Sequence, residues 1–67
     1  MTQNKDHGNL IKEHLKAKGC TQGWLALQLG VSFSITNAYA CNRKQPNLKM
    51  IFKVADLLGV SPKDLIE

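Results

Sequence analysis

The stretch TQGWLALQLGVSFSITNAYACNRKQP, residues 21–46, decides the fold of this chain. Two short helical patterns meet there at Gly30, and a glycine just past a helix supplies a left-handed turn from which the chain leaves steeply. Ala26, four residues earlier, is small enough for a second helix to cross closely over it. Val31 supplies an apolar plug after the turn, and Ser32 supplies an N-cap for the next helix. The spacing therefore predicts two helices that cross at a steep angle.

Two helices joined in this way form a helix-turn-helix, whose second helix projects into the major groove of DNA. The charge pattern favours the same partner, because a formal net charge of +4 and a pI near 9.3 attract anions. No acidic residue lies between Glu13 and Asp56. The basic residues of this interval are Lys16, Lys18, Arg43, Lys44, Lys49 and Lys53. The alternative interpretation is a solvated surface that happens to be basic.

The length of 67 residues allows one small domain with a marginal core, which disulfides, metal or self-association often supplement. Cys20 and Cys41 are the only cysteines, and we see neither a signal peptide nor a membrane-spanning apolar run. We therefore expect reduced thiols in the cytoplasm. The spacing of these cysteines with His7 and His14 matches no zinc motif, so we expect no metal and no other cofactor. His14 is expected to be a partly buried structural residue.

The apolar periodicity predicts an all-α domain of five short helices at residues 9–67, after a flexible polar arm at residues 1–8. The expected N-caps of the first four helices are Asn9, Thr21, Ser32 and Asn47. The expected inward residues are Leu10, Ile11, Leu15, Leu25, Ala26, Leu29, Leu48, Ile51, Phe52, Ala55 and Leu58. Gly19 and Gly59 are expected to end the first and fourth helices.

The third helix is expected to run to about Cys41, and Asn42 then tolerates the left-handed backbone of a helix exit. A capping-box pattern in residues 61–64 starts the fifth helix. Leu65 and Ile66 are expected to anchor this helix to the body of the domain.

The motifs of residues 9–66 resemble those of the Cro/C1-type helix-turn-helix family, also called the XRE family, of phage and bacterial regulators. The shared motifs are Thr21-Gln22, Leu25-Ala26, Leu29 to Ser32, Arg43-Lys44-Gln45-Pro46, Leu48, Val54-Ala55 and Leu58 to Ser61. The chain departs from the family at Thr36, where an aliphatic residue is usual, and at residues 40–42, where Glu-Asn-Gly is frequent. The resemblance implies a compact lambda-repressor-like domain that binds double-stranded DNA as a transcriptional regulator, with a repressor expected.

The resemblance also implies that the second helix sets its N-terminus against a phosphate, as the partial positive charge there allows. The expected contacts to the DNA backbone are Thr21, Gln22, Ser32, Arg43 and Lys44, with Lys49 and Lys53 as weaker candidates. With Thr36 and Tyr39 inward, the helical period turns the expected base-reading residues outward, namely Phe33, Ser34, Asn37, Ala38 and Cys41.

Asn37 is the one residue of this outward set able to make a bidentate pair with adenine. Phe33 either lies against thymine methyl groups or folds back on the protein. Because no arginine lies on this surface, we expect recognition that leans to A·T base pairs or to DNA shape.

Family members generally act as two-fold dimers on inverted half-sites, so we expect a homodimer, with a candidate interface near Leu65 and Ile66. We expect no enzymatic activity, because Ser32 and Ser34 lack a base partner, and no membrane or small-molecule partner. The alternative function is a protein-interaction module of the same fold, such as an antitoxin-like protein, which an uncharged third helix with Phe33 exposed leaves open. Nonspecific nucleoid or RNA binding fits the charge without explaining the helix-turn-helix pattern.

Overall fold

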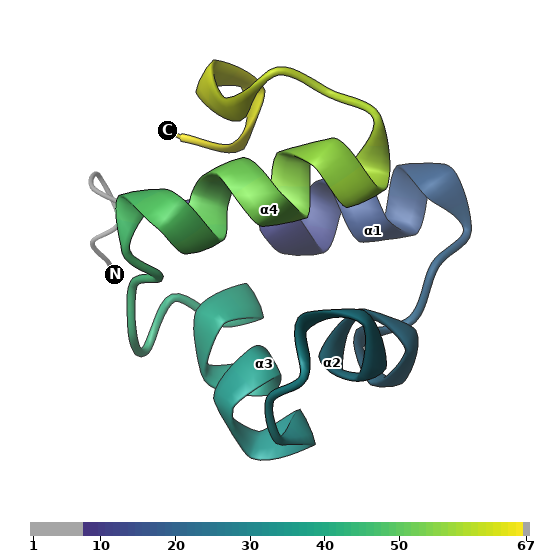
Figure 1. Ribbon diagram of the computed structural model, residues 1–67, viewed down its shortest axis with the longest axis vertical. Helices are drawn as coiled ribbons and strands as arrows, with labels where there is room; N and C mark the ends of the chain where they lie inside the picture. Colours follow the sequence, from purple (N-terminus) through teal and green to yellow (C-terminus); the bar gives the residue numbers. More distant parts are fainter. Residues whose placement is uncertain (1–7, 67) are drawn as a thin grey trace.

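A computed structural model describes residues 8–66 of the chain, and these residues form a helical domain (Figure 1). Its elements are α1 (Ile11–Lys18), α2 (Gln22–Leu29), α3 (Phe33–Ala40), α4 (Leu48–Leu58) and the 3-10 helix η1 (Pro62–Leu65). The expected all-α class is confirmed, but the fifth helix is a single 3-10 turn. Of the expected arm, residues 1–7 lie outside the described part of the chain.

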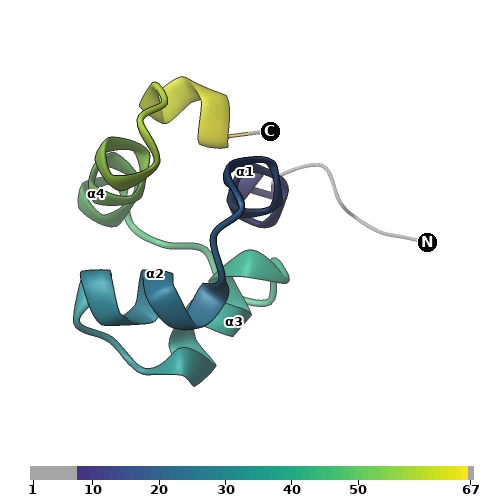
Figure 2. The ribbon, with the colours of Figure 1, turned by 90° about the vertical axis from the view of Figure 1, so that its right-hand side faces the viewer.

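The helices form two layers (Figures 1 and 2). α1 and α4 lie side by side, η1 covers them on one side, and α2 and α3 lie together on the opposite side. The core between them is apolar and draws on every helix but α3: Ile11, Leu15, Leu25, Leu29, Ile51, Val54, Ala55, Leu58 and Leu65. Thr36 and Ala40 of α3 are buried as well. The pair α2–α3 therefore stands on a platform made by α1 and α4.

The turn between α2 and α3 has the geometry that the sequence predicts. Gly30 adopts φ 71°, in the left-handed region. The backbone N–H groups of Gly30 and Val31 donate to the carbonyl oxygen of Ala26 over 2.9 and 3.2 Å. Ala26 itself is buried, and α3 crosses α2 steeply, since α2 is seen nearly end-on where α3 stands upright (Figure 1). The helix-turn-helix is confirmed.

Three of the four expected N-caps are confirmed by hydrogen bonds. Thr21 Oγ1 accepts from the N–H of Trp24 over 3.0 Å, and Ser32 Oγ accepts from Ile35 over 3.1 Å. Asn47 Oδ1 accepts from the N–H of Met50 over 2.8 Å. Each bond satisfies an N–H group that the first turn of a helix cannot bond internally.

The expected N-cap at Asn9 is wrong, because Leu10 occupies the cap position of α1 without a side-chain bond. The oxygen of the Asn9 side chain still accepts from the N–H of Ile11 over 3.0 Å, so it serves the first turn from one residue further back. The backbone N–H and the side-chain Nδ2 of Asn9 are bonded to the end of α3 and the loop that follows it. These tertiary contacts hold Asn9 outside the first turn of α1.

Leu48 and Phe52 were expected to face the core, and this expectation is wrong, since their side chains are 62% and 54% exposed. Val54 completes the buried stripe of α4 instead, together with Ile51. The apolar arc of α4 is wider than the surface that the other helices cover. Successive helical residues turn by about 100°, so Phe52 lies well to the side of the buried stripe.

Of the two residues expected to anchor the C-terminal segment, only Leu65 packs its side chain into the core. Its side chain is fully buried, whereas the side chain of Ile66 is 51% exposed. Residue 66 is extended, and its backbone forms an antiparallel bridge with Asn9. The chain leaves the 3-10 helix between these two residues, so their side chains do not continue one buried stripe.

His14 is partly buried and structural, as expected. Its Nε2 lies 3.0 Å from the carbonyl oxygen of Asp64, so the ring links α1 to η1. Asp64 in turn accepts a hydrogen bond from the N–H of Ser61 over 3.1 Å, which supports the start of η1. Within residues 8–66, every helix is too short to cross a membrane.

Candidate nucleic-acid interface

The two faces of α3 differ sharply in burial. Thr36 is fully buried, and Tyr39 packs partly buried against the core, which confirms their inward orientation. The hydroxyl of Thr36 donates to the carbonyl oxygen of Ser32 over 3.1 Å, so the departure from an aliphatic residue leaves no buried donor unsatisfied. The opposite face carries the exposed residues Phe33, Ser34 and Cys41 and the partly buried residues Asn37 and Ala38.

Phe33 does not fold back on the protein. Its side chain is 57% exposed at the first position of α3. Of the two orientations left open by the sequence, the structure has the one in which the ring is available to a partner. No charged side chain lies on α3, whose sequence is FSITNAYA. The outward face of this helix is therefore neutral, with one carboxamide, one hydroxyl and one aromatic ring.

Asn37 joins two other expected contact residues to itself in one cluster. Its Nδ2 donates to Oε1 of Gln22 over 2.8 Å, and its Oδ1 accepts from Nη2 of Arg43 over 2.8 Å. Gln22 is the first residue of α2, and Arg43 lies in the loop after α3. The fold thus brings together residues from three segments, and we call Gln22, Asn37 and Arg43 the amide–guanidinium cluster.

Among the residues that the structure describes, the start of α2 presents backbone N–H donors without a helical partner beside this cluster. The first hydrogen bond inside α2 runs from Leu25 to the carbonyl oxygen of Thr21 over 3.1 Å. The N–H groups of Gln22 and Gly23 precede it and have no helical partner. Such groups, together with the helix dipole, attract anions.

The loop after α3 is tightly folded and carries two exposed cations. Asn42 has φ 62°, which confirms the expected left-handed exit. The N–H groups of Arg43 and Lys44 then donate to the carbonyl oxygen of Ala38 over 2.9 and 3.2 Å, so the loop turns back onto the end of α3. Both side chains are exposed. Lys49 and Lys53 are also exposed, but on α4.

Comparison with known proteins places this geometry in a family. A family model described as helix-turn-helix matches residues 11–65. The chain belongs to the helix-turn-helix family of the Cro/C1 (XRE) type. It is also similar to a protein of known crystal structure, a candidate DNA-binding protein from Bacteroides fragilis, with 42% sequence identity and a TM-score of 0.90. The similarity covers 92% of this chain and 100% of that chain. No curated protein is significantly similar to this chain.

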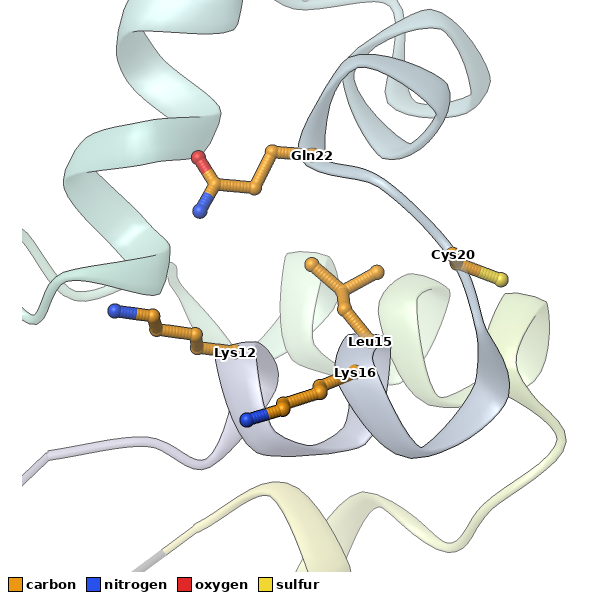
Figure 3. A pocket seen from close by; sticks show the side chains of 5 residues that line it. All are labelled: Lys12, Leu15, Lys16, Cys20 and Gln22. Atoms are coloured by element: carbon orange, nitrogen blue, oxygen red, sulfur yellow. The ribbon is translucent and has the colours of Figure 1, made fainter.

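This helix-turn-helix domain has a shallow pocket of about 260 Å³ next to Gln22 (Figure 3). Lys12, Leu15 and Lys16 of α1 line it together with Cys20 and Gln22. Figure 3 shows the side chains of Lys12 and Gln22 extending toward the same space, while the thiol of Cys20 points away. The pocket adds two cations from α1 to the surroundings of the α2 N-terminus. The four-residue spacing of Lys12 and Lys16 predicts that they share one face of α1, but no local pattern predicts that this face lies near Gln22.

We call residues 41–47, which join α3 to α4 in this helix-turn-helix domain, the basic loop. The residues that hold this loop in place were not predicted from the sequence. Asn9 and Gln45 are hydrogen-bonded to each other and to Asn42. Asn9 is separated from these partners by 33 and 36 residues, so no local pattern announces the contact.

The cysteines of the domain are free thiols, partly buried at Cys20 and exposed at Cys41. Within residues 8–66, no three His, Cys, Asp or Glu side chains gather as a metal site would require.

Proposed function

We propose that this helix-turn-helix protein binds double-stranded DNA in a sequence-specific manner, with α3 in the major groove, and acts as a transcriptional repressor. The observation that carries the proposal is the amide–guanidinium cluster, which unites residues of α2, α3 and the following loop on one surface. The similarity to the candidate DNA-binding protein from Bacteroides fragilis supports DNA as the partner. In this proposal residues 9–67 are the DNA-binding domain, and residues 1–8 are an arm that precedes it.

Asn37 is the proposed reader of adenine. A carboxamide has two N–H donors and two lone pairs on its oxygen. The cluster uses one N–H, toward Gln22, and one lone pair, toward Arg43. One donor and one acceptor remain, which is the pair that adenine requires at N7 and N6. The two protein bonds also distinguish the oxygen from the nitrogen of Asn37, so the amide is oriented before DNA arrives.

Gln22 is the proposed phosphate ligand at the α2 N-terminus. Because its Oε1 accepts from Asn37, the Nε2 end of the same amide remains available to donate to a phosphate oxygen. The proposed contacts to the DNA backbone are Thr21, Gln22, Ser32, Arg43 and Lys44, with weaker contributions from Lys49 and Lys53. These contacts fix the position of α3 on the duplex and add affinity without reading sequence.

The remaining outward residues of α3 are proposed to contact base edges. Phe33 and Ala38 offer apolar surface for thymine methyl groups, Ser34 offers a hydroxyl, and Cys41 lies at the C-terminal end of the helix. The expectation that no arginine lies on this surface is wrong, because the guanidinium of Arg43 is bonded to Asn37. No arginine projects from α3 itself, and this proposal assigns Arg43 to phosphate, so guanine contacts are few and A·T base pairs or DNA shape supply the specificity.

A homodimer is proposed because one recognition helix reads only a few base pairs, and family members pair inverted half-sites. Leu65 is buried and cannot form the interface that we expected near the C-terminus. The exposed apolar side chains Leu48 and Phe52, four residues apart on α4, and Ile66 supply the proposed contact instead. A dimer over two half-sites excludes other proteins from the DNA it covers, which is the basis of the proposed repression in the cytoplasm. In this proposal the protein acts by binding DNA and catalyses no reaction.

A protein-interaction module with this fold is the second candidate function. The observation in its favour is the exposed apolar surface of the helix-turn-helix itself, where Leu27 of α2 and Phe33 of α3 both face solvent. Under this alternative the neutral face of α3 binds a protein, as in an antitoxin-like protein, and the basic loop is a solvated surface.

The test is a selection of bound duplexes from a random-sequence DNA pool at near-physiological salt. We expect enrichment of an inverted repeat with half-sites about 10 base pairs apart. A parallel selection with the double variant Arg43→Ala and Lys44→Ala should lose this enrichment. No enrichment with the unaltered protein would contradict the DNA proposal and favour the protein-interaction module. Replacing thymine by uracil in the selected site then tests Phe33, because uracil lacks the methyl group.

A further inference from the structure

Asn9 is buried at the junction of α1 with the basic loop. Only 3% of its surface is exposed. Its Nδ2 donates to the carbonyl oxygen of Tyr39 over 2.9 Å and to Oε1 of Gln45 over 3.0 Å. Its Oδ1 accepts from the N–H of Ile11 over 3.0 Å. Both amide hydrogens and the oxygen of a polar side chain are thus used, as burial requires.

Asn42 completes the junction by pairing with the backbone of Asn9. Its Oδ1 accepts from the N–H of Asn9 over 2.7 Å, and its Nδ2 lies 3.3 Å from the carbonyl oxygen of Asn9 and donates to it. The same Oδ1 accepts from Nε2 of Gln45 over 3.1 Å. The carboxamide of Asn42 therefore replaces a neighbouring peptide group, and Asn9, Asn42 and Gln45 form a closed network, which we call the Asn9 network.

The Asn9 network leaves no room beside it. A Cβ atom added to Gly8 would lie 2.8 Å from Oδ1 of Asn42, closer than real Cβ atoms approach other groups. The segment of residues 8–10 is also bonded to the end of η1, because the N–H of Leu10 donates to the carbonyl oxygen of Leu65 over 2.8 Å. The segment is thus held between the basic loop and the end of η1.

Asn42 directly precedes Arg43, and Arg43 contacts Asn37. A hydrogen-bonded path therefore runs from Asn9 through Asn42 to the backbone of Arg43, and from its guanidinium to Asn37 and Gln22. We propose that Asn9 is a positioning residue of the DNA interface, which holds Arg43 where its guanidinium orients the carboxamide of Asn37. This inference rests on the proposed function.

The physical reason is conformational entropy. A long arginine side chain on a free loop loses rotamer and backbone freedom when it binds, and a loop already held in place loses less. Asn42 with φ 62° holds a backbone conformation that few residues other than glycine adopt readily, and its side-chain bonds to Asn9 compensate for this. The Asn9 network therefore acts at a distance from DNA, through the loop.

The experiment combines four variants: Asn9→Ala, Asn42→Gly, Arg43→Ala and the double variant Asn9→Ala with Arg43→Ala. Asn42→Gly is the variant that guards against a failure to fold, because glycine adopts the same positive φ but lacks the carboxamide. Affinity for the selected duplex is measured against salt concentration, well below the melting temperature of each variant and corrected for the folded fraction.

We expect Asn9→Ala and Asn42→Gly each to weaken binding by about fivefold to twentyfold, which lies within the range of coupling between residues in one network. The slope of log affinity against log salt should fall by about one, the change expected when Arg43 no longer neutralises a phosphate. In the Arg43→Ala background, Asn9→Ala should change the affinity by less than about twofold. Equal reductions of affinity in the two backgrounds, or unchanged binding by folded Asn9→Ala and Asn42→Gly, would overturn the inference.

A measurement without DNA separates this inference from the proposed function. The side-chain amide resonances of Asn37 report its bonds to Gln22 and Arg43. Asn9→Ala and Asn42→Gly should shift these resonances in the same direction as Arg43→Ala. If these shifts appear but the unaltered protein enriches no duplex, the DNA proposal fails and the positioning of Arg43 stands. If the resonances do not move, the inference is wrong whatever the protein binds.

Discussion

The side-chain amide of Asn37 donates a hydrogen bond of 2.8 Å to Oε1 of Gln22, and this bond joins the middle of α3 to the first residue of α2. The turn between the two helices is closed by the carbonyl oxygen of Ala26, which accepts from the N–H groups of Gly30 and Val31. Polar contacts thus hold the α2–α3 pair at two places, in the turn and between the start of α2 and the middle of α3. Asn37 has a structural role in addition to the proposed base contact, and the two roles make different predictions.

Replacing Asn37 by alanine should cost about 1–3 kcal/mol of binding free energy on the selected site and little on random DNA. The reason is that a bidentate pair with adenine contributes only where an adenine is present. Competitive binding of both duplexes to the folded variant measures the difference. An equal weakening on the two duplexes would mean that Asn37 acts through the phosphate contacts of Gln22 and Arg43 and reads no base.

Replacing Arg43 by alanine should weaken binding to all DNA sequences and lower the salt slope by about 0.9 for each phosphate that the guanidinium neutralises. The matched control is Lys63→Ala, which removes the same charge from an exposed residue of η1, on the side of the domain away from α2 and α3 (Figure 1). Titration of affinity against salt should separate the two variants. If Lys63→Ala lowers the slope as much as Arg43→Ala, the basic loop has no special place in binding.

Replacing Gly30 by valine should lower the melting temperature markedly, because a β-branched residue resists φ 71°. A Cβ at Gly30 meets no atom within 4 Å, so the cost comes from the backbone conformation and not from a clash. Gly23→Ala is the matched control: this glycine lies inside α2, its φ is not in the left-handed region, and a Cβ there meets only Thr21 Oγ1 at 3.8 Å. It should stabilise the domain by up to about 1 kcal/mol. Thermal unfolding followed by circular dichroism tests both, and equal shifts would refute the explanation.

Replacing Phe52 by glutamate should dissociate the proposed dimer without unfolding the domain, since the side chain is already half exposed on α4. A buried interfacial charge without a partner disfavours association. Leu27→Glu serves as the control, because Leu27 is a still more exposed apolar residue on α2. Sedimentation equilibrium without DNA should show monomers for Phe52→Glu alone. A dimer that persists in both variants would place the interface elsewhere.

The sequence by itself determined α2, α3 and α4, because the signals for these helices are local. The N-caps at Thr21, Ser32 and Asn47 and the left-handed exits at Gly30 and Asn42 each depend on residues within four positions, and all were predicted. The inward orientation of Thr36 followed from the resemblance to the family, which usually has an aliphatic residue there, and the helical period then turned the opposite face of α3 outward. The sequence therefore predicted which residues lie on the outward face of α3, but not which residues of other segments lie beside them.

Only the tertiary structure decided which apolar residues are covered and which polar groups meet. Phe52 shares the apolar arc of α4, but no neighbouring element covers it, and periodicity cannot report the width of a partner surface. The contacts of Asn37 with Gln22 and of Asn9 with Asn42 span 15 and 33 residues. Hydrogen bonds act over about 3 Å between groups whose distance is set by the packing of the helices, so no local pattern carries them.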